Sequence, residues 1–259
     1  MTNQHTEAEI ELVRESSLLV GKTLAEIAHY IAPGVKTITL DEIAEKFIRS
    51  QGATPGFKGY GGFPYSLCIS VNDVVVHGFP SNYELKDGDI VSVDCGAYKN
   101  GFHGDSAYTF PVGNVAEPIL KLMEDTKASL YKGIEQAIAG NRTGDIGSAI
   151  QIYTETRGYG VVRELIGHGV GRNLHQKPDV PNYGHPGNGS KLREGMVIAI
   201  EPMITLGKRN IKMERDGWTI RTLDGLPAAH YEHDVLIRKN EAEILSSFSE
   251  IEEVLKNKI

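Results

Sequence analysis

The sequence predicts an α+β fold in which two related halves share one sheet. Helical patterns cover roughly the first fifty residues, and β patterns cover 52–113. Helical patterns and then β patterns return in the same order after 116, and no short-period repeat interrupts them. We therefore expect one domain over 1–259, with pseudo-repeats at roughly 1–115 and 116–259.

Two capping patterns mark helix starts in the first helical region. Thr6 is followed by Glu9, and Thr39 by Glu42, the spacing at which each side chain satisfies a free backbone N–H of the other. After Thr39 the apolar residues fall on one helical face, and Gly52 follows as a C-terminal stop. Both threonines are therefore expected to begin helices.

The β patterns of the first half end in a predicted hairpin. Asn100 and Gly101 supply a turn that tolerates positive φ, between strand-like residues 89–99 and 102–110. The second half opens with Pro118 in the first turn of a helix. Further strand-like segments lie near 161–165, 196–204, 218–223 and 231–237.

Composition excludes several classes of protein. With 40% hydrophobic and 24% charged residues, the chain is typical of water-soluble globular proteins. A formal charge of −7 argues against general nucleic-acid binding, which depends on clustered Lys and Arg. Cys68 and Cys95 form no CxxC pair, which argues against a disulfide framework or a cysteine zinc site. The polar N-terminus resembles no secretory signal and no apolar run is long enough for a membrane span, so a cytoplasmic protein without membrane contact is expected.

Two carboxylates lie in hairpin strands that otherwise suit a buried core. Depending on whether the turn centres before or after Asn100, Asp105 pairs opposite Asp94 or opposite Gly96. Strand alternation places both carboxylates on one face in either register. Asp94 and Asp105 are therefore predicted neighbours.

Three further polar residues occupy similar places: Glu201 ends an apolar strand, Glu232 lies within another, and His168 is enclosed by glycines. Each alone has an ordinary explanation as a solvent-facing or salt-bridged side chain. Together, four carboxylates and one imidazole match a site for two hard divalent cations, and oxygen-rich ligation suits Mn, Fe or Co.

The motifs that carry these residues form an ordered series. VDCG is followed by HGD, whose aspartate lies eleven positions after that of VDCG, then by GHGVG, IEP and YEH. The series resembles the metal-ligand series of the methionine aminopeptidases, and the likeness covers roughly residues 5–240. It implies the pseudo-twofold pita-bread fold (creatinase/aminopeptidase fold) with a curved central antiparallel sheet flanked by helices. Only 30 residues separate Glu201 from Glu232, which leaves no room for the type II insertion, so the short bacterial type I form is the nearer match.

The resemblance implies a hydrolase that removes the initiator methionine from nascent proteins when the second residue is small. It makes Asp94, Asp105, His168, Glu201 and Glu232 the ligands of two divalent ions, with Asp105 and Glu232 bridging and Glu201 also transferring a proton. A water or hydroxide between the metals would be the nucleophile. The sequence leaves the metal open among Co, Mn, Fe, Zn and Ni.

The resemblance also assigns substrate contacts. His175 would stabilise the oxyanion and His77 would contact the substrate peptide, whereas His103 and His233 would orient ligands or be structural. The walls of the methionine pocket would be Tyr60, Phe63, Cys68, Leu174 and Trp218. Relatives often carry tyrosine at the Phe63 position or an aromatic at the Leu174 position, and without the motifs each would be read as ordinary core.

Two alternatives remain open at this point. A relative with the same fold and metals could cleave Xaa-Pro bonds, although such enzymes usually bring a large N-terminal domain. A pita-bread binding protein without catalysis would lose ligand positions, which are all present here. The expected partners are the N-terminal methionine of nascent polypeptides and, transiently, the ribosome, and a monomer is expected.

Overall fold

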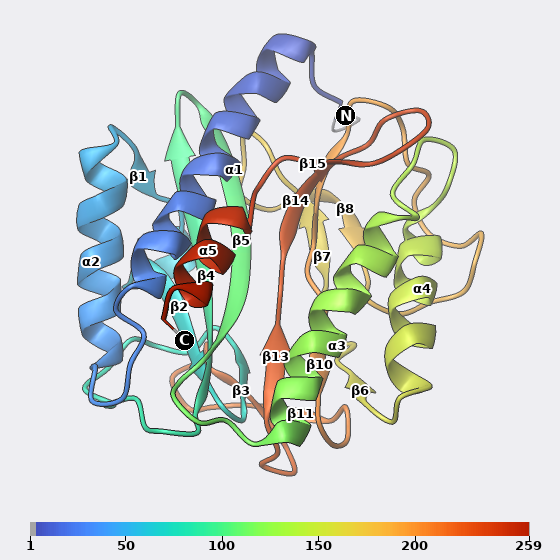
Figure 1. Ribbon diagram of the computed structural model, residues 1–259. Helices are drawn as coiled ribbons and strands as arrows, with labels where there is room; N and C mark the ends of the chain where they lie inside the picture. Colours follow the sequence, from blue (N-terminus) through green and yellow to red (C-terminus); the bar gives the residue numbers. More distant parts are fainter. Residues whose placement is uncertain (1–3, 259) are drawn as a thin grey trace.

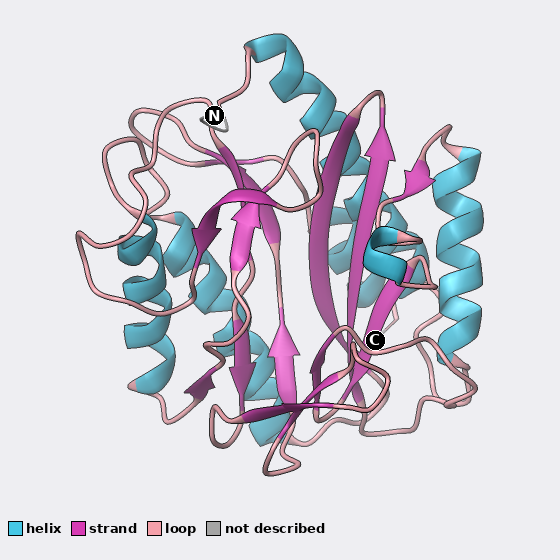
Figure 2. Ribbon diagram, turned by 180° about the vertical axis from the view of Figure 1, so that it is seen from behind, coloured by secondary structure: helices cyan, strands magenta, loops and turns pink. Residues whose placement is uncertain are grey.

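The computed structural model describes residues 4–258, in which helices cover one side of the strands (Figures 1 and 2). The helices are α1 (Glu7–Ala28), α2 (Thr37–Ser50), α3 (Glu117–Ile134), α4 (Thr143–Glu155) and α5 (Ser249–Lys256), with a 3₁₀ turn η1 (Tyr60–Gly62). None of the helices in the described residues is long and apolar enough to cross a membrane.

The strands pair antiparallel and form four hydrogen-bonded sheets within the described residues. The first sheet contains β1 (Thr54–Pro55), β2 (Leu67–Val71), β4 (Ile90–Lys99) and β5 (Phe102–Pro111), and the second β3 (Val74–Val76), β11 (Ile211–Met213) and β12 (Ile220–Thr222). The third contains β6 (Gly160–Val161), β10 (Met203–Thr205) and β13 (Ala228–His230). The fourth contains β7 (Gly167–Gly169), β8 (Gln176–Val180), β9 (Val197–Ile200), β14 (His233–Leu236) and β15 (Glu243–Ile244). The predicted α+β architecture is confirmed.

The β4–β5 hairpin turns at Asn100 and Gly101, whose φ values are 51° and 88°. Two consecutive positive φ values give the turn the twist that matches the flanking strands. The register pairs Gly96 with Asp105. The second of the two expected registers is therefore present.

Helix α1 begins as predicted. The backbone N–H of Glu9 donates to the Thr6 hydroxyl at 3.3 Å, and the Thr6 N–H donates to the Glu9 carboxylate at 3.0 Å. This reciprocal box satisfies two free donors of the first turn.

The predicted capping box at Thr39 is wrong. Helix α2 begins at Thr37, and its N-cap, Lys36, makes no side-chain capping bond. The Thr37 hydroxyl donates to the Ser81 carbonyl at 3.1 Å and accepts from the Ser81 N–H at 2.9 Å. This contact with the loop at Ser81 fixes the start of the helix at Thr37, two residues before Thr39. The predicted stop is confirmed, because α2 ends at Ser50 and Gly52 has a φ of 71°.

The main hydrophobic core lies between the helices and the strands. Leu24 of α1, Leu130 of α3 and Val93 of β4 belong to one buried cluster, and burial of each such side chain contributes about 2 kcal/mol. Val93 and Cys95 lie in this cluster, so strand alternation turns Asp94 to the opposite face. The face away from the helices is therefore free to carry polar groups.

Candidate active site

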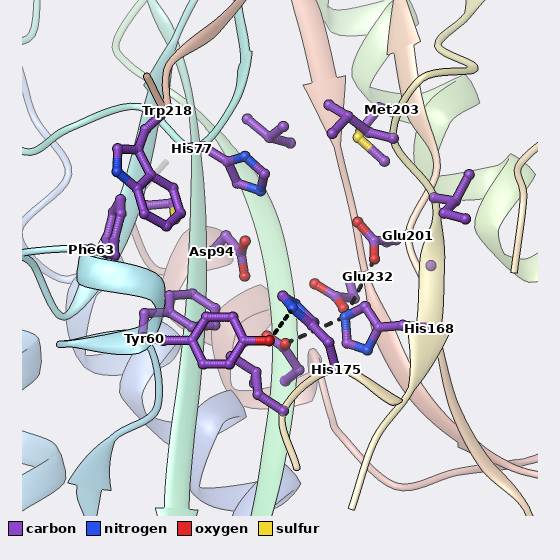
Figure 3. A pocket seen from close by; sticks show the side chains of 18 of the residues that line it. Tyr60, Phe63, His77, Asp94, His168, His175, Glu201, Met203, Trp218 and Glu232 are labelled. Atoms are coloured by element: carbon purple, nitrogen blue, oxygen red, sulfur yellow. Dashed lines mark hydrogen bonds and ion pairs between the residues drawn. The ribbon is translucent and has the colours of Figure 1, made fainter. Parts of the chain in front are cut away.

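A cavity of about 300 Å³ is lined by side chains from the strands and from the loops that connect them (Figure 3). Its lining combines acidic and imidazole groups with apolar side chains. The polar members include Asp94, Asp105, Glu201, Glu232, His77, His168 and His175, and the apolar members include Tyr60, Phe63, Cys68, Leu174 and Trp218. The structure therefore brings every sequence-predicted site residue to one cavity.

Both halves of the chain contribute to the acidic floor. Asp94 and Asp105 come from β4 and β5, and Glu201 follows β9. Glu232, which precedes β14, donates its backbone N–H to the Ala107 carbonyl at 3.0 Å, and its own carbonyl accepts from the Ser106 hydroxyl at 2.6 Å. These two bonds to β5 bring Glu232 beside the hairpin carboxylates.

The ligand-type atoms form overlapping triads. Asp94, Asp105 and Glu232 make one triad, and His168, Glu201 and Glu232 make a second, with the atoms of each triad within 4.8 Å of one another. Glu232 is common to both. A third grouping joins Asp105 and His168 to His175, a histidine for which the sequence predicts no ligand role.

Burial disfavours the charged form of all four carboxylates. It raises the pKa of Asp94 to about 7 and the pKa values of Asp105, Glu201 and Glu232 well above their ordinary range. Repulsion from neighbouring carboxylates, Asp94 above all for Asp105 and Glu201, acts in the same direction. Bound cations would reverse both effects, because they compensate the negative charge.

Three buried carboxylate oxygens in the cavity have no hydrogen-bond partner within the described part of the chain, as expected of a site that binds a cation. Asp94 Oδ1, Asp105 Oδ1 and Glu232 Oε1 are buried and have no hydrogen-bond partner among residues 4–258. Buried polar atoms are ordinarily paired. Carboxylate oxygens with one imidazole are the donor set of a divalent metal site, so the residues fit the group.

His168 presents one free nitrogen to the carboxylates. Its Nδ1 lies 3.0 Å from the Gly169 carbonyl, to which it donates, and its Nε2 lies 3.6 Å from Glu201 Oε1 and 3.9 Å from Asp105 Oδ2. Burial and then the neighbouring His175 lower the pKa of His168 to about 3. The ring is therefore neutral near pH 7, as a metal-binding imidazole must be.

His175 and His77 lie on different sides of the acidic floor (Figure 3). The Nδ1 of His175 lies 3.0 Å from the Tyr60 hydroxyl, and the two rings meet edge to face at 5.0 Å. His77 follows β3 with a φ of 58°, a left-handed conformation that costs a non-glycine residue free energy and is common at functional sites. Its ring lies edge-on to Trp218 at 6.4 Å.

The apolar walls form a cluster separate from the main core. Phe63, Cys68 and Leu174 are almost fully buried, and Trp218 packs against them. Phe57 completes the cluster and was missed by the sequence analysis. A Cβ on Gly96 would lie 2.6 Å from the Phe57 ring, so the glycine of VDCG makes room for this wall.

The remaining histidines have different surroundings. The His233 ring stacks on Phe248 at 3.8 Å and its Nδ1 lies 2.6 Å from the Ser246 hydroxyl, while His103 lies against Tyr98 at 4.7 Å. His230 was missed, although it is 1% exposed and its Nε2 lies 3.8 Å from Glu201 Oε2. The signal was present, because His230 stands two positions before Glu232 and side chains two apart in an extended chain share a face.

Comparison with known proteins shows which family the chain resembles. The profile of metallopeptidase family M24 matches residues 11–239. The chain belongs to metallopeptidase family M24. A methionine aminopeptidase of Clostridium perfringens is 54% identical over 240 residues, 93% of this chain and 96% of the relative.

Solved structures of M24 relatives confirm the pita-bread fold. The methionine aminopeptidase of Thermotoga maritima superposes with a TM-score of 0.93 at 42% identity, covering 95% of this chain and all of that one. A prolidase of Pyrococcus furiosus shares the fold with a TM-score of 0.78 at 24% identity, covering 95% of this chain but 65% of the prolidase. As an M24 member, the chain has its acidic and imidazole residues clustered for divalent metal binding.

Proposed function

We propose that this chain is a metal-dependent aminopeptidase that removes the N-terminal methionine from polypeptides whose second residue is small. The observation that carries the proposal is that two kinds of surface line one cavity: an apolar wall of Phe63, Cys68, Leu174 and Trp218, and a floor of four carboxylates. An unbranched thioether suits the wall, and a peptide bond next to it would lie over the floor. The family relatives named methionine aminopeptidase support the same activity.

The proposed ligands are Asp94, Asp105, His168, Glu201 and Glu232. The two triads, which share Glu232, would hold two divalent ions, and Asp105, which also groups with His168, would contribute to both. When bound, such ions polarise the scissile carbonyl and lower the pKa of water toward neutrality. The candidate ions are Co, Mn, Fe, Zn and Ni, which differ in preferred geometry rather than in charge.

The side chains around this centre have separate proposed roles. Glu201 moves the proton between water and the departing amine, since its carboxylate faces the cavity and burial raises its pKa. We assign the Tyr60 hydroxyl as the donor to His175 Nδ1, 3.0 Å away, and this tautomer leaves Nε2–H to donate to the oxygen of the scissile carbonyl. His77, beside Trp218, contacts the substrate peptide.

The direct test is release of methionine from Met-Ala-Ser and Met-Leu-Ser after chelation, followed by stepwise return of Co, Mn, Fe, Zn or Ni. Metal-dependent cleavage that strongly prefers Met-Ala-Ser is expected. Glu201→Ala should lower kcat by at least about 100-fold. If no metal restored cleavage, the aminopeptidase proposal would be wrong and a binding role would replace it.

Cleavage of Xaa-Pro bonds is the rival reaction. Prolidases share the fold, but at 24% identity that likeness supports the fold alone. Faster release from Xaa-Pro peptides than from Met-Ala-Ser would favour this reaction.

We further infer that the chain acts in the cytoplasm as a monomeric, single catalytic domain on nascent chains at the ribosome. One continuous core that includes residues of both pseudo-repeats supports the single domain. A sedimentation velocity run checks the monomer, and absence of co-sedimentation with ribosomes at low salt would argue against the ribosome contact.

A further inference from the structure

His230 is a buried imidazole that the proposed mechanism does not use. Its side chain is 2% exposed, and both Nδ1 and Nε2 are without a hydrogen-bond partner among residues 4–258. A neutral imidazole carries one donor and one acceptor, and leaving both unpaired in a core is unfavourable. The ring therefore requires an explanation beyond packing.

The backbone of His230 is fixed from β5. Its N–H donates to the Thr109 hydroxyl at 3.0 Å, and the same hydroxyl donates to its carbonyl at 2.7 Å. In β13, His230 also pairs with Met203 of β10, two residues after Glu201. These contacts hold the ring next to the end of the Glu201 side chain.

The Glu201 carboxylate lies between two imidazoles. Its Oε1 is 3.6 Å from His168 Nε2, and its Oε2 is 3.8 Å from His230 Nε2. The backbone carbonyl of Glu201 is already held, because Asn182 Nδ2 donates to it at 2.9 Å. At 3.8 Å, Oε2 and His230 Nε2 lie just beyond hydrogen-bond distance, so a small rotation of the carboxylate would bring them within range.

We propose that His230 is a positioning residue for Glu201: its Nε2–H donates to Oε2 and thereby turns Oε1 toward His168 and the ligand cluster. This inference rests on the proposed function. It deepens that function, because the Glu201 carboxylate is assigned both metal binding and proton transfer. Hydrogen bonds to ligating carboxylates typically change metal affinity or activity by about 10- to 100-fold.

The first test uses the wild-type protein labelled with ¹⁵N-histidine. Nitrogen and proton shifts report which ring nitrogen carries the proton, and the His230 signals are assigned by their loss in His230→Gln. The proposal requires the Nε2–H tautomer before and after Zn²⁺, which is diamagnetic, is added. A ring protonated at Nδ1 alone in the Zn²⁺-loaded protein would overturn the proposal.

The second test compares two amide side chains, glutamine and asparagine, at position 230. The side chain of His230→Gln reaches Glu201 with an N–H donor, whereas His230→Asn is one methylene shorter and falls short. We expect His230→Gln to keep Co²⁺ affinity and kcat within about threefold and to leave the Co²⁺ visible spectrum unchanged. We expect His230→Asn to weaken Co²⁺ binding, to shift the spectrum and to lower kcat by about 10- to 100-fold, with KM nearly unchanged. Equal values for both variants would overturn the positioning role.

Controls separate this role from stability and from the reaction. His233→Gln removes another buried histidine, which bonds Ser246 and stacks on Phe248, and should lower Tm without shifting the Co²⁺ spectrum. If His230→Asn does not fold, the tautomer measurement on the wild type decides. Failure of the wild type to release methionine would contradict the proposed function, while the tautomer and Co²⁺ affinity would still test His230.

Discussion

Asp234 Oδ2 accepts a hydrogen bond from the backbone N–H of Asp105 at 2.8 Å, although 129 positions separate the two residues. The same oxygen accepts from the Ser17 hydroxyl of α1 at 2.6 Å. Asp234 is fully buried, so one carboxylate oxygen joins α1, β5 and β14 directly behind a proposed metal ligand. The position of Asp105 therefore depends on a side chain that does not line the cavity.

Removal of Asp234 should destabilise the protein. In Asp234→Ala the Asp105 N–H loses its acceptor, and an unpaired buried donor costs about 1–3 kcal/mol. The Ser17 hydroxyl loses one of its two acceptors and keeps the Val13 carbonyl at 3.0 Å, which adds about 1 kcal/mol. We expect a loss of about 2–4 kcal/mol in the free energy of unfolding, measured in urea on metal-free protein. Ser17→Ala removes one of the two bonds and should cost about 1 kcal/mol; equal losses for both variants would contradict the assignment.

Removal of the shared ligand should affect metal content more than removal of an unshared one. Glu232 belongs to both triads, whereas Asp94 belongs to one. Glu232→Gln should therefore hold less than one Mn²⁺ per chain after dialysis, and Asp94→Asn about one, by elemental analysis. Two ions retained in Glu232→Gln would show that the triads are independent.

Metal loading should stabilise the wild type. Cations that bind the folded chain and not the unfolded one add about 2.7 kcal/mol at about 100 times Kd. A calorimetric scan should show Tm rising with Mn²⁺ concentration and falling to the metal-free value when EDTA is added. In a variant with both Asp94→Asn and Glu232→Gln, this dependence should disappear.

The size of the apolar pocket should limit the substrate side chain. Leu174 is 1% exposed in the wall, so Leu174→Trp fills part of a cavity of about 300 Å³. We expect KM for Met-Ala-Ser to rise about tenfold or more, because the methionine loses its apolar contacts. Leu174→Met conserves volume and should stay within about threefold. An unchanged KM in Leu174→Trp would place the methionine elsewhere.

The capping box of α1 should contribute stability that depends on pH. The Thr6 backbone N–H, then Arg172 and the Thr6 hydroxyl, lower the pKa of Glu9 from 4.5 to about 2. The folded state thus binds fewer protons, so this contribution is present above pH 4.5 and is lost as pH falls toward 2. Because the group is near the surface, it amounts to less than about 1 kcal/mol.

The measurement is the difference in free energy of unfolding between wild type and Glu9→Gln at pH 6, 4 and 3. The difference should be largest at pH 6 and shrink toward pH 3. A difference that is constant with pH would exclude the Glu9 carboxylate as the cause.

Local signals in the sequence determined much of this protein. The dipeptide Asn100-Gly101 predicts a tight turn, and either register that this turn allows puts Asp94 and Asp105 on one face; the structure has the register that pairs Gly96 with Asp105. Thr6 with Glu9, and Gly52, mark helix ends through contacts only a few residues apart. The ordered motif series then predicted which residues line one cavity, and every one of them does.

Tertiary structure decided the features that depend on partners far along the chain. Thr39 fits a capping pattern, yet α2 begins earlier, at Thr37, because the Thr37 hydroxyl donates a hydrogen bond to the Ser81 carbonyl. Phe57 approaches the cavity because Gly96 leaves room, and His230 faces Glu201 because Thr109 fixes its backbone. Local patterns report the conformational preferences of neighbouring residues, whereas these contacts arise only when separate strands pack. The sequence therefore determined the residue types of the proposed metal site and the strand face of its hairpin carboxylates, and packing decided which side chains support them.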